Sequence, residues 1–446
     1  MKARLRKWMG QLAESFWLMP ASMVLGGILL AVALVALDRS GALPAWVEGS
    51  SWLYNGGGTG ARILLGAVAS STIGVAGTVF SITIAALSLA AGQMGPRLLR
   101  NFTRDRGNQF TLGAFLGTFS YALMVLRSVR TQDEGVFTPH LSLSVGLLLA
   151  FGCVATLVYF VGHMASRISV DTVIDLVSND VTRAMRVLVV ERPNLDPPPE
   201  DFWDSAVAVV DSRRGYLQQL DEAALAEWAA AHGTTLRLLV RRGDYLFPGA
   251  PIALMSVRVP EAEAAIRRNT ALGAARGSTG DAEQTIRQLV EVAVRALSPG
   301  INDPHSAMSV LDRLGDALCD LAGKVIPNGV HAVNGRLALV VPTVSYRSLC
   351  DVMFHLIRQS SEGNTALLIK LVEILAVVAV CEPEPERLEV LAAHAARMAA
   401  DAQRTIGNAA DAADIQSKLQ HFEQILLARQ HGNVTATALL GRAAHA

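Results

Sequence analysis

Four long stretches without a charged side chain limit what this chain can fold into more than any other feature. They run from Phe16 to Leu37, from Ile63 to Gly92, from Phe110 to Leu126 and from Leu141 to Gly162. A helix needs roughly 20 apolar residues to cross about 30 Å of hydrocarbon, where it satisfies its own backbone hydrogen bonds. The third stretch is short unless its helix continues to Val129. The sequence therefore predicts an α-helical membrane domain in residues 1–165, with about four transmembrane helices at 16–37, 63–92, 110–129 and 141–162.

The first stretch follows a basic N-terminal segment, as the apolar part of a secretory signal would. Its run of about 22 residues is longer than the roughly 7–15 residues of a signal peptide, so we expect it to remain as an anchor. Composition supports the membrane assignment, because 17% of the residues are charged, against about 25% in soluble proteins.

Basic residues in the short connections predict the orientation. The N-terminal segment and the connection between the second and third stretches each carry four cations, whereas the two opposite connections carry fewer. Connections rich in Lys and Arg are retained in the cytoplasm. We therefore expect the N-terminus and everything after the fourth stretch to be cytoplasmic.

The second stretch carries small residues at every third or fourth position, a spacing that places them on one helix face. They are Gly66, Ser70, Gly74, Gly77, Ser81, Ala85, Ser88 and Gly92. Three interpretations remain open: close helix packing inside one subunit, the wall of a pore formed by several copies, or a substrate path in a transporter. The transporter is the weakest, because no charged residue lies at mid-membrane depth. The pore hypothesis selects Ser70, Gly74, Gly77, Thr78, Ser81 and Ser88 as lining residues, with Arg97 and Arg100 at the inner mouth.

The rest of the chain is expected to form an α+β cytoplasmic domain. We predict a connecting helix and Pro-rich linker in residues 166–200, a small β-barrel-like subdomain in 201–259, and a mainly helical subdomain with a β-hairpin in 260–446. The run from Gly243 to Pro251 resembles the turn of biotinyl/lipoyl-like barrel sandwiches, but no lysine lies between Lys7 and Lys324 to carry a cofactor. The dipeptide Asn334-Gly335 is a strong hairpin signal.

The segment from Ala366 to Cys381 is very apolar but contains Lys370 and Glu373. A fifth membrane span would place both charges in lipid. We therefore expect a helix buried in the soluble domain or between subunits.

Asn302, Asp303 and His305 form the one polar group that suggests a site. Asp303 followed by Pro304 is typical of a helix N-terminus, with the aspartate as N-cap and the proline in the first turn. Helix capping explains these residues without chemistry. The alternative is a small-anion site at the free backbone amides of the helix start.

Sequence signals for catalysis are missing. The chain contains no Walker loop, GxGxxG, GxSxG or HExxH motif, and its ten histidines show no metal-ligand spacing. The four cysteines lack CxxC spacing and are expected to be buried, reduced thiols. The net charge of zero argues against a nucleic-acid partner. We therefore expect no enzyme activity, no cofactor and no metal.

Several motifs resemble one known family. They are Phe80-Ser81-Ile82-Thr83-Ile84, Pro96-Arg97-Leu98-Leu99-Arg100-Asn101-Phe102, Leu116-Gly117-Thr118-Phe119, Leu126-Arg127-Ser128-Val129-Arg130 and Ala296-Leu297-Ser298-Pro299-Gly300-Ile301-Asn302-Asp303-Pro304. Over nearly the whole chain the sequence is similar to an uncharacterised family of predicted bacterial inner-membrane proteins, the domain of unknown function twenty-two fifty-four. The resemblance implies a multi-pass protein of the bacterial inner membrane and no assigned activity.

Two functions remain. The first is an oligomeric ion channel, with the second span lining the pore and the cytoplasmic domain assembling or gating it. Its partners would be the lipid bilayer, further copies of the chain and inorganic ions. The alternative is a non-conducting, membrane-anchored ligand-binding or scaffold protein.

Overall fold

The computed structural model describes residues 16–40, 57–94, 105–130, 137–167, 169–191, 195–274, 276 and 282–430. The chain divides into two compact units, Met1–Thr172 and Val173–Ala446. The inner-mouth candidates Arg97 and Arg100 lie outside the described residues.

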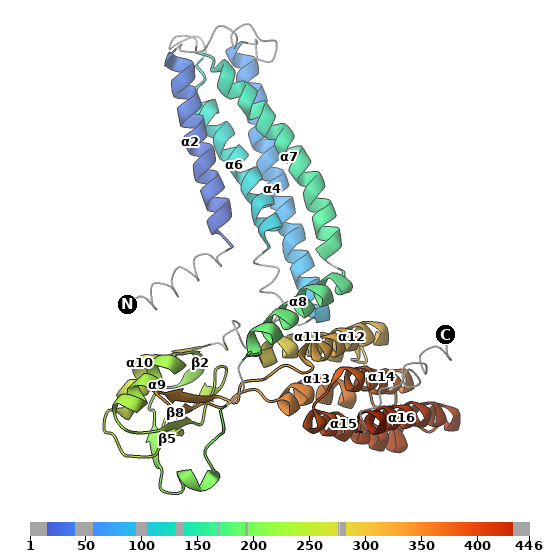
Figure 1. Ribbon diagram of the computed structural model, residues 1–446. Helices are drawn as coiled ribbons and strands as arrows, with labels where there is room; N and C mark the ends of the chain where they lie inside the picture. Colours follow the sequence, from blue (N-terminus) through green and yellow to red (C-terminus); the bar gives the residue numbers. More distant parts are fainter. Residues whose placement is uncertain are drawn as a thin grey trace. The chain divides into compact units, whose positions relative to one another are not determined.

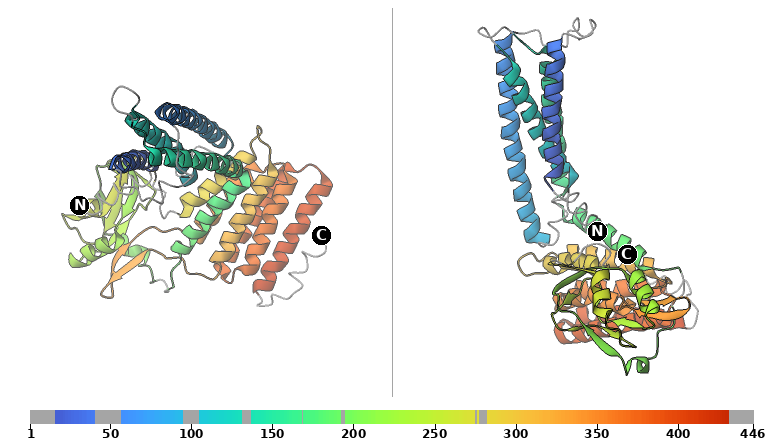
Figure 2. Two further views of the ribbon diagram at one scale, coloured as in Figure 1. Left: turned by 90° about the horizontal axis from the view of Figure 1, so that it is seen from above. Right: turned by 90° about the vertical axis from the view of Figure 1, so that its left-hand side faces the viewer.

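The first unit contains four long helices. These are α2 (Leu18–Ser40), α4 (Gly58–Met94), α6 (Arg106–Ser128) and α7 (His140–Arg167). All four are long and apolar enough to cross a membrane, which confirms the predicted number within the described residues. The helices lie side by side, as both views show (Figures 1 and 2). Helix α4 has 37 residues and extends beyond both ends of the predicted span.

Helix α6 is the centre of this bundle. It packs against α2, α4 and α7. Just over half of the residues in its apolar stretch are buried, a larger share than in any of the other three helices. Beside it, Asp38 of α2 caps the start of α7 by accepting hydrogen bonds from the backbone N–H groups of Leu141 (3.1 Å) and Ser142 (3.0 Å). The Tyr121 hydroxyl of α6 donates to the Ser142 carbonyl at 2.7 Å. These bonds satisfy backbone groups that lipid could not.

The second unit begins with helix α8 (Val170–Leu188), which straddles the boundary between the units, and the short 3₁₀ helix η2 (Glu200–Trp203). Two β-sheets follow, with helices α9 (Glu222–Ala231) and α10 (Ala262–Asn269) between their strands in sequence. The strands are β1 (Val207–Val210), β2 (Gly215–Leu220), β3 (Leu236–Leu238), β4 (Tyr245–Leu246), β5 (Pro251–Met255), β6 (Thr270–Gly273), β7 (Val330–Val333) and β8 (Arg336–Val340).

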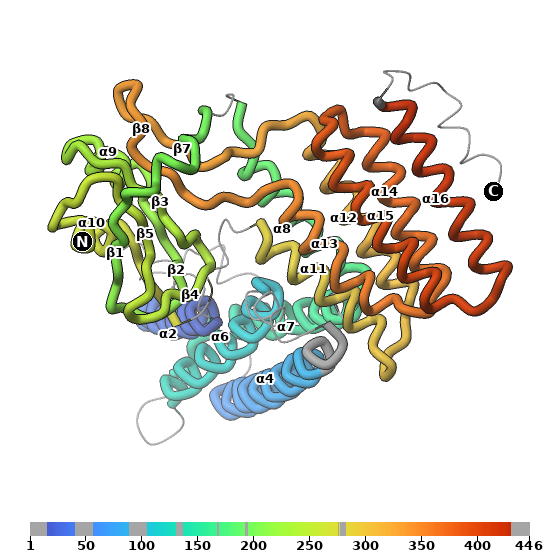
Figure 3. The backbone as a smooth tube through the Cα atoms, turned by 90° about the horizontal axis from the view of Figure 1, so that it is seen from below, coloured from blue at the N-terminus to red at the C-terminus, as the bar shows by residue number. Residues whose placement is uncertain are grey.

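The predicted barrel-like subdomain is not supported. The strands form an open five-stranded sheet in the order β1-β5-β3-β8-β7 and a separate three-stranded sheet in the order β4-β2-β6, and Figure 3 shows the strands from below. One core cluster joins the two sheets and helix α9, with Leu217, Leu225, Leu236 and Leu339 among its buried members. The barrel expectation rested on the Gly-Asp turn after Arg242, and such a turn also fits an open sheet.

The hairpin at Asn334-Gly335 forms, as predicted, between β7 and β8. Its position differs from the prediction, which placed it with the helical residues. Strand β8 pairs in parallel with β3, with Leu236 opposite Leu339. The hairpin thus extends the sheet that begins at Val207, because its buried face completes the same apolar core.

Six helices form the remainder of the unit: α11 (Ala282–Ala296), α12 (Pro304–Leu321), α13 (Tyr346–Ser360), α14 (Thr365–Cys381), α15 (Pro385–Thr405) and α16 (Ala409–Gln430). Helix α14 packs against α12, α13, α15 and α16, and α12, α14, α15 and α16 lie side by side in Figure 3. Helix α14 corresponds to the apolar segment from Ala366 to Cys381 that was expected to form a buried helix.

The two charged side chains of α14 form ion pairs with neighbouring helices. Lys370 pairs with Asp312 of α12 at 2.7 Å, and Glu373 pairs with Lys418 of α16 at 2.8 Å. The last residue of α14, Cys381, is exposed. The expectation of buried thiols is therefore wrong there, although Cys153 and Cys350 are buried.

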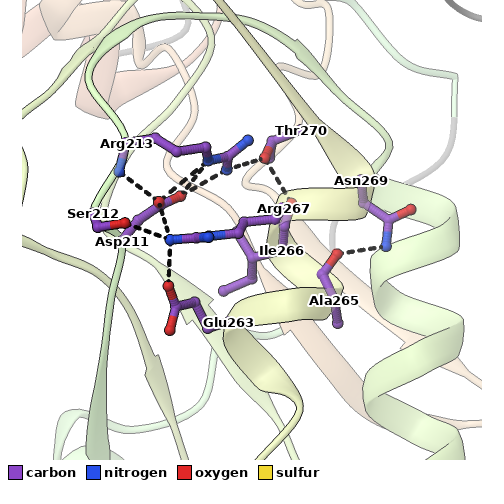
Figure 4. Close-up of polar contacts among 9 residues, drawn as sticks. All are labelled: Asp211, Ser212, Arg213, Glu263, Ala265, Ile266, Arg267, Asn269 and Thr270. Carbon is purple, nitrogen blue, oxygen red and sulfur yellow. Dashed lines mark hydrogen bonds and ion pairs between the residues drawn. The ribbon is translucent and has the colours of Figure 1, made fainter.

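A buried carboxylate fixes the end of strand β1 (Figure 4). Asp211 has no exposed surface, and it accepts hydrogen bonds from Arg213 Nε and Nη2 at 2.9 and 2.6 Å. Arg267 of α10 approaches the second oxygen at 3.4 Å, and Arg213 also donates to Thr270 of β6 at 2.8 Å. Burial alone would raise the pKa of Asp211, but the Arg213 hydrogen bonds and the charge of Arg267 outweigh it and hold that pKa below its usual value.

Candidate functional site

The small-residue face of α4 points away from the other three helices of its bundle. Six pore candidates, Ser70, Gly74, Gly77, Thr78, Ser81 and Ser88, are all exposed. The opposite face is buried, with Leu65, Val68, Thr72, Ala76 and Val79. Alternation between the two faces follows the helical period.

Open space surrounds this face within the described part of the chain. A Cβ atom built on Gly66, Gly74 or Gly77 would have no described neighbour within 4 Å. Packing against the described residues of the same subunit therefore does not account for these glycines.

Close helix approach occurs instead between α2 and α6. A Cβ atom on Gly27 would lie 2.4 Å from the Gly117 carbonyl oxygen, and one on Gly117 would lie 2.9 Å from the Met23 carbonyl oxygen. A Cβ atom on Gly113 would lie 2.5 Å from the Met23 sulfur and 3.2 Å from the Pro20 Cα atom. Small residues spaced by four on α6 thus hold α2 close, which is the usual basis of helix association in lipid. From the sequence alone, close packing is one of three interpretations of the stripe on α4, and the residues of α6 were not assigned this role.

The hydroxyl groups of the α4 face donate to their own helix. Ser70 bonds the Ala67 carbonyl at 3.2 Å, Thr78 the Gly74 carbonyl at 3.2 Å, and Ser81 the Gly77 carbonyl at 2.9 Å. Each hydroxyl oxygen still has lone pairs to accept from water or coordinate a cation. The face is therefore compatible with lipid and with water.

The Asn302–His305 segment forms a helix cap. Asp303 is the N-cap of α12 and accepts from the Ser306 backbone N–H at 3.1 Å and the Ser306 hydroxyl at 2.6 Å. The Ser306 hydroxyl is the main cause of a lowered Asp303 pKa. Asn302 adopts a positive φ of 49° at the turn, a conformation that Asn tolerates better than most residues. The capping interpretation explains Asn302 and Asp303, and the small-anion site stays a prediction.

Sequence reasoning missed a cavity of about 700 Å³ in the second unit. Its wall is formed by the end of α8 and the residues after it, by the α9 start, by the turn after β3, by Arg276 and the α11 start, and by the β7–β8 hairpin with its flanking segments. The cavity is the size of many small-ligand sites. No motif marked it, because its residues come from six separate stretches of chain.

Cationic groups dominate the polar part of this cavity. The guanidinium groups of Arg241, Arg242 and Arg276 line it beside His331, against one lining carboxylate, Glu222. Glu222 pairs with His331 at 3.3 Å and Arg242 at 3.1 Å. The His331 hydrogen bond, with help from Arg242, lowers the Glu222 pKa despite burial. The described lining therefore carries a net positive charge and favours an anionic ligand.

A second cluster escaped the sequence analysis. Asp351 and His355 lie one turn apart on α13, and His394 faces them from α15. Burial lowers the pKa of His394 to about 4, against the opposing attraction of Asp351. The Asp-x-x-x-His spacing was a usable signal, but its third member is on another helix.

Comparison with known proteins identifies the family of the chain. The family model described as "Predicted membrane protein (DUF2254)" matches residues 13–377, from before α2 into α14. The chain belongs to this family. DUF2254 proteins are thus its relatives, as the motifs around Ser81 and Ala296 indicated.

Three DUF2254 relatives come from mycobacteria: uncharacterized proteins of Mycobacterium tuberculosis strains CDC 1551 and H37Rv and of Mycobacterium bovis. Each is 32% identical over 374 residues, covering 81% of this chain and 72% of the relative. No solved structure matches the chain.

Proposed function

We propose that this membrane protein is an oligomeric ion channel of the bacterial inner membrane. Helix α4 lines the pore, and the second unit assembles or gates it on the cytoplasmic side, with both termini in the cytoplasm. One observation carries the proposal: the small, hydroxyl-bearing face of α4 has no partner among the residues of its own chain that the structure describes.

Two physical arguments support this assignment. Helices associate in lipid through tight van der Waals contact, so a long face of glycine and serine gains little from facing lipid tails. Copies of α4 around an axis would instead place Ser70, Gly77 and Ser81 toward water and ions. The distribution of basic residues in the connections supports the orientation.

Ser81→Trp is expected to reduce single-channel conductance by roughly tenfold or more, because an indole ring would fill a narrow pore. The matched control is Val158→Trp on α7, since Val158 is 71% exposed and carried by a different helix. The measurement is planar-bilayer recording of the purified, reconstituted protein, with its oligomeric state determined by cross-linking.

Equal conductance of the two variants would show that α4 does not line the pore. A monomeric protein, or no current from an intact oligomer across salts, voltages and membrane tension, would reject the channel itself.

The cationic cavity favours a second function, the binding of an anionic ligand by a membrane-anchored module without conduction. Arg242→Gln is expected to abolish thermal stabilisation by pyrophosphate or adenosine diphosphate. The substitution removes one cation from the cavity and leaves Glu222 without its Arg242 partner.

Arg268→Gln is the matched control, because Arg268 is exposed on α10 and does not line the cavity. Differential scanning fluorimetry of the three proteins measures the effect. Stabilisation that survives in Arg242→Gln, or that neither anion produces in the wild type, would count against this function.

A further inference from the structure

Three metal-binding side chains meet between helices α13 and α15. The Asp351 Oδ1 atom lies 3.1 Å from His355 Nε2 and 3.3 Å from His394 Nε2. One ligand atom from each of the three residues lies within 4.8 Å of the other two. The helices pack directly against each other and belong to the same unit.

These separations suit a tetrahedral ion. Zn²⁺ binds histidine nitrogen and carboxylate oxygen at about 2.0–2.1 Å, so ligand atoms on one tetrahedron lie about 3.3 Å apart. Both distances from Asp351 Oδ1 are close to that value. The two histidines need to move toward each other by no more than a side-chain adjustment.

The cluster has the chemistry that a metal site requires. Imidazole nitrogen and carboxylate oxygen are both common ligands of zinc-class ions. His394 is 1% exposed, and its Nδ1 atom is buried without a hydrogen-bond partner in the described part of the chain. The Nε2 atom of the same ring, 3.3 Å from Asp351 Oδ1, is the nitrogen that would bind the ion.

One cation competes for this position. Arg397 Nη1 lies 3.4 Å from Asp351 Oδ1 and also contacts His355 Nε2. Arg397 is 43% exposed, so its guanidinium can swing into solvent. The other nearby arginine, Arg358, is held by Asp401 and stays with that partner.

We propose that Asp351, His355 and His394 bind one divalent transition-metal ion of the zinc class. The carboxylate and two imidazole nitrogens supply three ligands, and water takes the fourth position, with Arg397 displaced. The ion would link α13 to α15 and stabilise the helical part of the second unit. This inference is independent of conduction and of the cationic cavity.

Titration of the full, untagged chain in detergent tests the site after removal of bound metal with a chelator. Co²⁺ is the optical probe, because tetrahedral Co²⁺ absorbs in the visible range, and Zn²⁺ competition gives the affinity. We expect saturation at one equivalent. His355→Gln, at a half-buried position, is expected to weaken binding by at least about tenfold, whereas His421→Gln on α16 leaves it unchanged.

Arg397→Gln provides a readout that a purely structural cluster would not give. Removing the competing cation is expected to tighten metal binding severalfold. No saturable binding, a His355→Gln titration that overlays the wild type, or weaker binding by Arg397→Gln would each overturn the proposal. Circular dichroism of each variant verifies that the helices remain folded.

Discussion

Asp211→Asn is expected to destabilise the second unit by about 3–5 kcal/mol, because it leaves Arg213 without its buried carboxylate partner, whereas Arg267 keeps its pair with Glu263. The Asp211 side chain is fully buried and holds strand β1 to β6 through Arg213. A loss of this size would lower the unfolding midpoint by about 10 °C. Hydrogen exchange of strands β1 and β2 in the full chain would measure it locally.

Glu200→Gln is the control for this prediction. Glu200 pairs with Arg237 at 3.0 Å, but its side chain is 85% exposed. An exposed ion pair contributes about 0–1 kcal/mol, so this variant should exchange like the wild type. Equal protection in the Asp211 and Glu200 variants would show that the buried pairing contributes little.

The Asp211 carboxylate also makes the stability of the second unit depend on pH in the acid range. Its pKa in the folded state lies below the unfolded value of about 3.9. The stabilisation is therefore present above about pH 4 and is lost as pH falls through the lowered folded pKa. The Asp211→Asn variant should lose less stability than the wild type over that acid range.

Gly27→Ala is expected to lower the stability of the helix bundle of the first unit by about 1–3 kcal/mol, the usual cost of overpacking a close contact. The added methyl group would lie 2.4 Å from the Gly117 carbonyl oxygen, and backbone cannot yield as a flexible side chain can. Helices α2 and α6 would have to separate. The measurement is the thermal midpoint of monodisperse protein in detergent, with cross-linking between α2 and α6 as the structural readout.

Gly26→Ala is a control one residue away on the same helix. A Cβ atom on Gly26 meets nothing within 4 Å, and alanine is a better helix former than glycine. This variant should be as stable as the wild type or slightly more so. If both variants behave alike, α2 and α6 do not pack through Gly27.

Local sequence signals predicted several elements well. The uncharged stretches predicted four spans, Asp303-Pro304 a helix start, and Asn334-Gly335 a hairpin, and all are present. Each of these elements depends on interactions within a few residues of the chain. They are backbone hydrogen bonding inside a helix in lipid, capping of a free amide, and a positive φ in a tight turn. The expectation of a barrel failed because strand order depends on partners far away in sequence, as β3 and β8 illustrate.

By itself, the sequence determined where the chain prefers lipid and which residues share a helix face, since both follow from side-chain polarity and the helical period. Tertiary structure alone decided which face of α4 has no neighbour in the described ranges, which glycines hold two helices together, and which distant histidine joins Asp351 and His355. The reason is that the residue pattern of one segment limits the kinds of surface it can pack against. Which segment becomes its partner depends on the shape and burial of all segments together.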